Sequence, residues 1–146
     1  MRPTQAPIGL LLAQTAKTVG RAFDDALAAA GGSLPEWLIL LGLTRGGHDS
    51  QSDLAATVGV QGPTLTHHLN GLEKAGLVTR TRLPDNRRVH QVALTEAGRA
   101  KFHRLRQAAM AYDARLRQGL VEDELDMLRS LLGRLAANVE KDGREG

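Results

Sequence analysis

The chain has 146 residues and contains no cysteine, which excludes disulfides, thiol-ligated metal sites and sensing by thiol oxidation. Aromatic residues are also scarce: there is one Trp, one Tyr and two Phe. That is too few for the stacked platforms that hold single-stranded DNA or unpaired RNA bases. No apolar run is long enough to span a bilayer, and the N-terminus lacks the layout of a signal peptide. We therefore expect a cytoplasmic protein with no membrane partner.

Motifs of catalysis are missing as well. The chain has no Gly-rich loop after a strand, no nucleophile elbow and no thiol nucleophile. The cluster Glu122-Asp123-Glu124 suits the acidic first turn of a helix, where carboxylates complement the helix dipole. We therefore expect that the protein is not an enzyme.

Five histidines raise the question of a metal site. His67 and His68 are adjacent on a predicted helix and are expected to point in different directions, unlike paired ligands at i and i+4. His48, His90 and His103 are distant in sequence and could converge only by folding. We predict no dedicated metal site and no cofactor.

What the chain does contain is one core and a localised basic segment. With 146 residues, 42% of them hydrophobic, it can bury a single real core. The net charge of +3 is modest, but Arg80, Arg82, Arg87 and Arg88 lie close together, whereas acidic residues concentrate in the last third. This segregation favours a surface for an anionic partner, and the shortage of aromatic residues favours duplex DNA.

A first short helix is predicted after Ser50, where Ser50 and Asp53 have the three-residue spacing of a capping box. Its core side would be Leu54, Ala55 and Val58. Gly59 then breaks the helical period, because glycine adopts the left-handed conformation without steric cost. Helix, short turn and helix is the spacing of a helix-turn-helix.

A second helix is predicted from near Pro63 to the glycine at position 76. Its buried stripe consists of three residues at i, i+4 and i+7, namely Leu65, Leu69 and Leu72. The opposite face carries small hydrogen-bonding groups that can reach base edges or phosphates: Pro63, Thr66, His67 and Asn70, with Thr64 at the margin.

A hairpin with a basic tip follows this helix. Residues 77–82 favour a strand, Pro84-Asp85-Asn86 favours a turn, and residues 89–94 favour the returning strand. Arg87 and Arg88 are expected at or just past the tip. A basic hairpin directly after a polar-faced helix predicts a winged helix-turn-helix that contacts DNA, although an ordinary surface hairpin with solvated arginines is the alternative.

Long helical patterns flank this region. One covers residues 8–29 and another opens at Thr95, and their apolar residues recur at spacings of three and four up to Val139. These apolar stripes require partner helices to pack against, either in a bundle within one chain or in an intertwined dimer. We favour the dimer, because the terminal helices extend beyond what a compact winged domain can cover.

Nearly the whole chain resembles the MarR family of bacterial regulators. The resemblance rests on five segments: Ser33-Leu34-Pro35-Glu36-Trp37, Ser52-Asp53-Leu54-Ala55, Leu72-Glu73-Lys74-Ala75-Gly76-Leu77-Val78, Asp85-Asn86-Arg87 and Leu94-Thr95-Glu96-Ala97-Gly98. It implies a mainly α fold of the α+β type, in which one domain spans 1–146. Residues 33–94 would form the winged helix-turn-helix lobe, and long helices within 5–32 and 95–141 the dimerisation domain.

The resemblance also implies a function and site residues. The expected protein is a homodimer that binds a pseudo-palindromic operator in double-stranded DNA, usually as a repressor released by a small molecule. The DNA-binding positions carried over are Gln61, Gly62, Pro63, Thr64, Thr66, His67 and Asn70 on the helix-turn-helix, with Arg87 and Arg88 on the wing. Arg87 would enter the minor groove, oriented by Asp85. Many members carry Arg where this chain has His67, so bidentate guanine reading is not implied there.

Two functional points stay open at the sequence level. The family's effector cleft usually lies between the dimerisation helices and the DNA-binding lobe, so Trp37 and Phe102 are candidates to line it. Packing in the core is the competing interpretation of Trp37, which lies on an apolar helix. The competing function is a winged domain that serves as a protein-interaction module without specific DNA binding.

Overall fold

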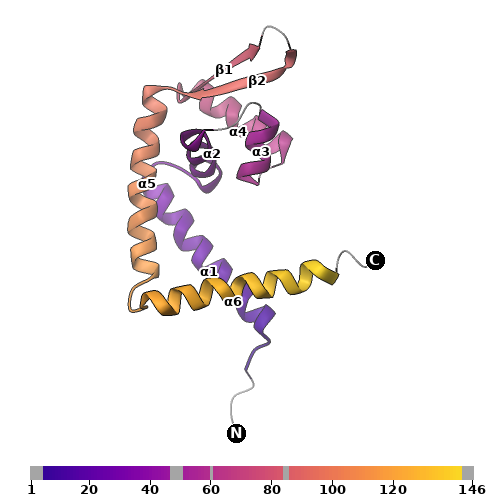
Figure 1. The fold of residues 1–146 in the computed structure, drawn as a ribbon. Helices are drawn as coiled ribbons and strands as arrows, with labels where there is room; N and C mark the ends of the chain where they lie inside the picture. The colour runs from indigo at the N-terminus through magenta and orange to yellow at the C-terminus, as the bar shows by residue number, and fades with distance from the viewer. Residues whose placement is uncertain (1–4, 47–50, 60, 84–85, 143–146) are drawn as a thin grey trace. The chain divides into compact units, whose positions relative to one another are not determined.

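The computed structural model of the protein describes residues 5–46, 51–59, 61–83 and 86–142. Along these residues it has the elements drawn in Figure 1: α1 (Ile8–Ala29), α2 (Leu34–Arg45), α3 (Gln51–Val58), α4 (Gly62–Lys74), β1 (Val78–Leu83), β2 (Asn86–Leu94), α5 (Glu96–Leu116) and α6 (Glu122–Asp142). The predicted mainly α, winged helix-turn-helix fold is confirmed. The chain divides into two compact units, Met1–Tyr112 and Asp113–Gly146, and each is described by itself.

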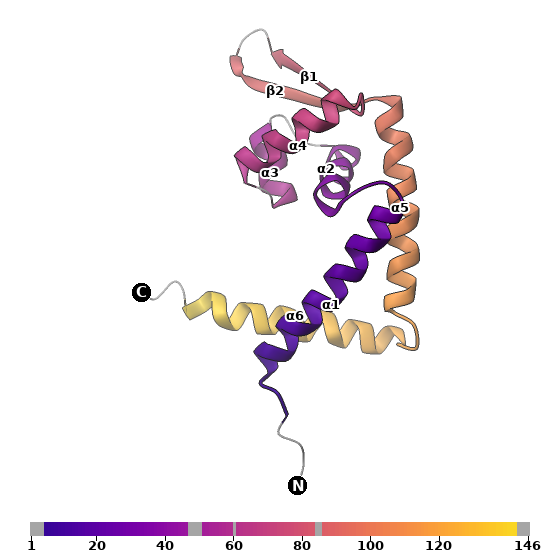
Figure 2. The ribbon, with the colours of Figure 1, turned by 180° about the vertical axis from the view of Figure 1, so that it is seen from behind.

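The helix-turn-helix packs around the first of two hydrophobic clusters. This cluster joins four elements through Ile39, Leu54, Leu65, Leu69, Leu72, Leu77 and Val78. Figure 2 shows α2, α3 and α4 gathered on one side of the hairpin. The predicted stripe Leu65, Leu69 and Leu72 is thus confirmed as the buried face of α4. Gly59 has the left-handed φ of 77° expected at the turn, whereas Ser50 and Val60 lie outside the described residues.

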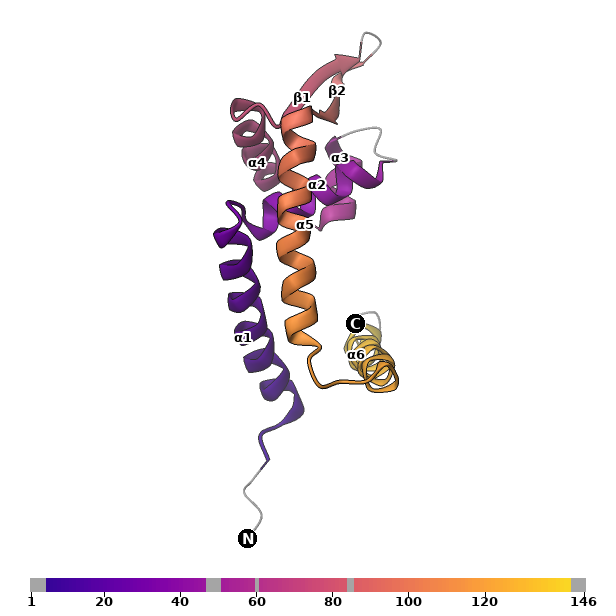
Figure 3. The same ribbon diagram turned by 90° about the vertical axis from the view of Figure 1, so that its left-hand side faces the viewer.

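The second hydrophobic cluster joins α1, α2 and the first part of α5. It consists of Leu27, Trp37, Leu40, Phe102 and Leu105. Farther along, the rings of Phe23 and Tyr112 stack at 4.9 Å, and the Tyr112 hydroxyl donates to the Val19 carbonyl at 2.6 Å. These contacts hold α1 against α5, as Figure 3 shows.

The start of α5 is tied to the connection between α4 and β1. The Thr95 hydroxyl donates to the Gly76 carbonyl at 2.6 Å and accepts from the Gly98 N–H at 3.0 Å, so it caps α5 and joins two segments. Gly98 is buried, and a Cβ at this position would lie 2.0 Å from the Leu77 carbonyl oxygen. The close approach of the two backbones therefore requires glycine at position 98.

The hairpin is an antiparallel ladder that runs from Val78 opposite Leu94 to Arg82 opposite His90. The last pair, Leu83 with Asn86, skips residues 87–89 of β2 and leaves an irregular, bulged stretch there. The second strand therefore begins at Asn86 rather than at Val89, and the assignment of Asn86 to the turn was wrong. The reason is the pairing with Leu83, which the local turn propensity of Asn86 does not reveal.

The second unit contains the end of α5 and all of α6. Glu122, Asp123 and Glu124 form the acidic first turn of α6, as predicted, and the Glu124 carboxylate accepts from the Val121 N–H at 3.0 Å. Leu125 is buried. Six large apolar side chains of α6 are exposed instead: Met127, Leu128, Leu131, Leu132, Leu135 and Val139.

Candidate nucleic-acid interface

The two faces of α4 differ sharply in chemistry. Leu65 and Leu69 are fully buried, while the other face presents small or polar groups to solvent. The exposed residues are Gln61, at the N-cap position, and Gly62, Pro63, Thr64, His67 and Asn70, and Thr66 is half-buried. Such a face can approach a nucleic acid closely, because none of its side chains is both long and charged.

Thr66 is already engaged within its own helix. Its hydroxyl donates to the Gly62 carbonyl one turn earlier, at 3.0 Å. The methyl group of this side chain is the part that a nucleic acid could contact without breaking that bond. A threonine methyl is a natural contact for the methyl group of thymine.

The wing arginines lie in the irregular part of the hairpin. The backbones of Arg87 and Arg88 belong to β2, within the three residues that the ladder skips. Irregular stretches of this kind in a strand are over-represented beside functional sites. Asp85, the predicted orienting carboxylate, lies outside the described residues.

Arg80 belongs to the basic segment of the sequence, but its charge is paired within the protein. Its guanidinium, on β1, donates to both carboxylate oxygens of Glu73 on α4, at 3.2 and 3.3 Å, and to the Asn70 side-chain oxygen. Only 16% of the Arg80 side chain is exposed. The sequence alone did not predict this contact. Glu73 and Arg80 are seven residues apart in the chain, on either side of Gly76, which follows the end of α4.

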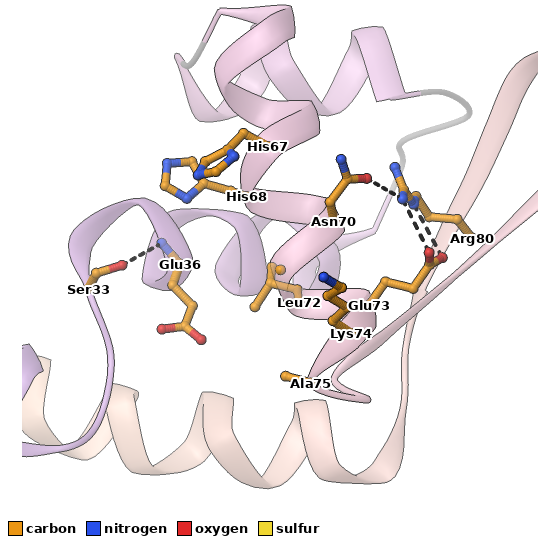
Figure 4. Close-up of a pocket in the computed structure, with 11 residues that line it drawn as sticks. Ser33, Glu36, His67, His68, Asn70, Leu72, Glu73, Lys74, Ala75 and Arg80 are labelled. Carbon is orange, nitrogen blue, oxygen red and sulfur yellow. Dashed lines mark hydrogen bonds and ion pairs between the residues drawn. The ribbon is translucent and has the colours of Figure 1, made fainter.

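A hollow of about 670 Å³ adjoins this contact (Figure 4). Its lining comes from the start of α2, the second half of α4 and β1: Ser33, Glu36, His67, His68, Asn70, Gly71, Leu72, Glu73, Lys74, Ala75 and Arg80. The two histidines lie toward Ser33 and Glu36, on the side away from Arg80. Their rings meet edge to face at 5.7 Å, so the expectation that they point in different directions was wrong.

Trp37 and Phe102, the candidates for an effector cleft, stack on each other. Their ring centroids are 5.4 Å apart and the ring planes differ by 7°. Both side chains are buried in the second hydrophobic cluster. The core interpretation of Trp37 therefore agrees with its position, and a ligand between the two rings would have to separate them.

Two further features concern the described residues only. Among them, no group of three or more His, Asp or Glu side chains is arranged to hold a metal ion. None of their helices is by itself both long and apolar enough to cross a membrane. Only α1 and α2 taken together, with a 74° bend between them, reach that length and composition.

Known proteins share this fold and sequence pattern. The model of the MarR family matches residues 33–90. Transcriptional regulator PA3341 is 34% identical, and its crystal structure matches 92% of this chain and 99% of its own with a TM-score of 0.74. The transcriptional repressor CouR, solved on a 23-mer DNA duplex, is 31% identical over 89% of this chain and 92% of its own, with a TM-score of 0.79.

Two other comparisons extend these matches. CouR from Rhodococcus jostii RHA1, solved with p-coumaroyl-CoA, aligns at 26% identity over 93% of this chain and 96% of its own, with a TM-score of 0.75. The HTH-type transcriptional regulator YdgJ of Bacillus subtilis (strain 168) is 30% identical over 90 residues, or 62% of this chain and 55% of YdgJ. The match thus spans about half the length of that curated relative. The chain belongs to the MarR family of winged helix-turn-helix transcriptional regulators.

Proposed function

We propose that the protein is a homodimeric repressor that binds a near-palindromic operator in double-stranded DNA. The observation that carries this proposal is the polar, exposed face of α4 opposite the fully buried Leu65 and Leu69. A helix anchored in this way can enter the major groove with its short side chains against the base edges. The relative CouR, which is solved on a DNA duplex, supports the same assignment.

Each DNA-contacting residue has a proposed role. Gln61 and the residues from Gly62 to His67 on the exposed side of α4 face the major groove, and Asn70 lies near its edge. Arg87 enters the minor groove from the wing, with Arg88 beside it and Asp85 as its orienting carboxylate. The irregular pairing at residues 87–89 supports this role, because such irregularities are over-represented beside functional sites.

Dimerisation is proposed from the apolar surface that the chain leaves uncovered. In the first unit, Ile8, Leu11 and Met110 are at least half exposed. In the second unit, Leu120, Met127, Leu128 and Leu131 line an apolar hollow, and α6 carries further exposed apolar residues. Exposed apolar area of this extent marks an interaction surface. Two-fold symmetry would place the recognition helices about one DNA turn apart, roughly 34 Å.

We further propose that a small molecule relieves repression. CouR in complex with p-coumaroyl-CoA supports a ligand of this general kind. Two places can receive it: the Trp37–Phe102 stack, if the rings separate, and the hollow beside His67 and His68. Since Trp37 is the only tryptophan, its indole NMR signal and those of the histidines during a titration with p-coumaroyl-CoA distinguish them. Larger changes at Trp37 favour the stack, whereas larger changes at His67 and His68 favour the hollow.

We propose that the protein is a regulator rather than an enzyme and that it acts in the cytoplasm.

The proposed DNA binding is tested by selecting the purified protein against a random duplex library. Salt titrations on the selected sequence and on a scrambled control follow. A repressor of this kind enriches a near-palindrome, and its log affinity falls with log salt by about 0.9 for each phosphate contacted. Absence of binding at low salt would instead favour a protein-interaction module.

Two variants test the site assignment on the selected operator. Arg87→Ala should weaken operator binding by about 5- to 150-fold, since it removes a groove contact worth roughly 1–3 kcal/mol. Thr66→Ala should change the preferred base more than the salt dependence. Arg129→Ala, which removes the same charge from an exposed position on α6, is the control. If the first two variants bind like the control, the assigned residues are wrong.

A further inference from the structure

The contact between Arg80 and α4 has the geometry of a positioning device. Two guanidinium nitrogens of Arg80 meet the two oxygens of Glu73, and one of the two nitrogens also meets the Asn70 oxygen. Such paired hydrogen bonds between an arginine and a carboxylate fix orientation as well as distance. Arg80 therefore fixes the orientation of the Glu73 and Asn70 side chains on the recognition helix relative to the first strand of the wing.

The charge of Arg80 is not available to DNA in this arrangement. Glu73 neutralises it at close range, and 84% of the Arg80 side chain is buried while 44% of Glu73 is exposed. A phosphate-binding arginine would need the opposite, an exposed guanidinium without a carboxylate against it. Although Arg80 belongs to the basic segment, it orients neighbouring side chains and does not attract DNA phosphates.

The contact with Arg80 also determines which end of the Asn70 amide is exposed. Asparagine reads adenine with both ends of its amide, accepting from N6 and donating to N7. In this protein the amide oxygen of Asn70 faces Arg80, so the exposed end is the NH₂ group. That group donates, and it suits a base acceptor or a phosphate oxygen.

We propose that Arg80 is a positioning residue for operator recognition, which turns Asn70 so that its NH₂ group donates to an acceptor on the DNA. The inference rests on the proposed function and deepens it. Arg80 is not needed to join the wing to α4, because other contacts already do so. The Leu77 N–H donates to the Leu72 carbonyl at 2.9 Å, and Leu77 and Val78 are buried in the first cluster.

The experiment compares Arg80→Ala, Arg80→Lys and Glu73→Gln with the wild type on the selected operator and on scrambled DNA. We expect Arg80→Lys to resemble Arg80→Ala, since lysine keeps the charge but loses the planar fork. Both should lose about tenfold in operator affinity and leave scrambled-DNA binding and the salt slope unchanged. The melting temperature should change by less than about 8 °C, because an ion pair of this kind adds little stability.

Glu73→Gln gives the sharpest discrimination, because the two roles of Arg80 predict opposite signs. If Arg80 positions Asn70, removing the charge of Glu73 loosens the contact and lowers operator affinity. If Arg80 contacts phosphate, the same change frees its charge and raises affinity for both DNAs. A rise, or rescue by Arg80→Lys, overturns the inference.

Asn70→Asp supplies a further readout: it keeps an oxygen toward Arg80, removes the NH₂ donor and adds a negative charge, so the loss on the operator is compared with the loss on scrambled DNA. We expect the operator to lose affinity by a larger factor than scrambled DNA does, and equal losses on the two DNAs would contradict the role of Asn70. A wild-type protein with no preference among duplexes would remove the proposed function and this inference together. A selective wild type with indifferent Arg80 variants would remove the inference alone.

Discussion

The two units of the chain treat their apolar side chains in opposite ways. The first unit buries most of them in two clusters, one around α4 and one around Trp37 and Phe102, and exposes them mainly at the start of α1. In the second unit, α6 buries Leu125 and exposes six other large apolar residues. A helix so exposed gains little from packing in its own chain, and packing supplies most helical stability in proteins. The first unit thus has cores of its own, whereas α6 exposes the apolar surface from which we propose dimerisation with a partner chain.

The largest effect is expected where that partner would bind. Leu132→Lys should raise the dimer dissociation constant by more than about a thousandfold, because each unpaired charge buried at an interface costs several kcal/mol. Sedimentation over a range of concentrations measures it. Ser130→Lys adds the same charge to an exposed polar position of α6 and should leave the dimer intact. Equal behaviour of the two variants would mean that α6 does not form the interface.

The next effect tests the core of the reading unit. Leu69→Ala should lower the free energy of unfolding by about 2–5 kcal/mol, since it removes a fully buried side chain. Leu131→Ala makes the same chemical change at a residue that is 43% exposed, and should cost far less. Urea unfolding in the monomeric Leu132→Lys background measures both without a contribution from association. Similar losses would erase the difference between the units.

A smaller effect is expected at the junction between α5 and the α4–β1 connection. Gly98→Ala should destabilise the protein by about 1–3 kcal/mol, because the new methyl group meets a backbone carbonyl that cannot move aside cheaply. Gly71→Ala places the same group in open space on α4 and should stabilise by roughly 0.5–1 kcal/mol. Thermal unfolding measures the change in stability of both variants. If Gly98→Ala leaves the stability unchanged, the two backbones at the junction can move apart to admit a methyl group.

The smallest effects concern ion pairs in the two units. Glu36 and Lys101 are 2.8 Å apart and less than a fifth exposed, so Glu36→Gln should cost about 1 kcal/mol. Asp126 and Arg129 pair at the same distance on α6 but are more than 60% exposed. Asp126→Asn should therefore cost less than about 0.5 kcal/mol. Chemical denaturation with and without salt would rank the pairs, and the reverse ranking would contradict the burial argument.

Helical periodicity predicted most of this architecture because it is local. The boundaries of α1 and the buried stripe of α4 follow from spacing along the chain alone. The start of β2 does not, since Asn86 joins the strand only by pairing with Leu83. The family resemblance supplied the DNA-facing positions, which local pattern alone suggested only in part.

The role of Arg80 shows why part of the site was not predictable. Its positive charge groups it with the wing arginines in the sequence, but its surroundings depend on Glu73 and Asn70, which fold against it across the glycine turn. Likewise, the sequence contains Trp37 and Phe102 but does not reveal that they stack. Such contacts are decided by tertiary packing, which residue spacing does not encode.

The hydroxyl of Thr95 has a mechanical consequence. With one hydrogen bond on each side, it fastens the first turn of α5 to the connection that follows α4, and the two backbones approach closely at Gly98. The first turn of α5 and the connection after α4 are therefore held together by bonded and close-packed atoms, so that a displacement of either segment requires these contacts to break or the other segment to follow.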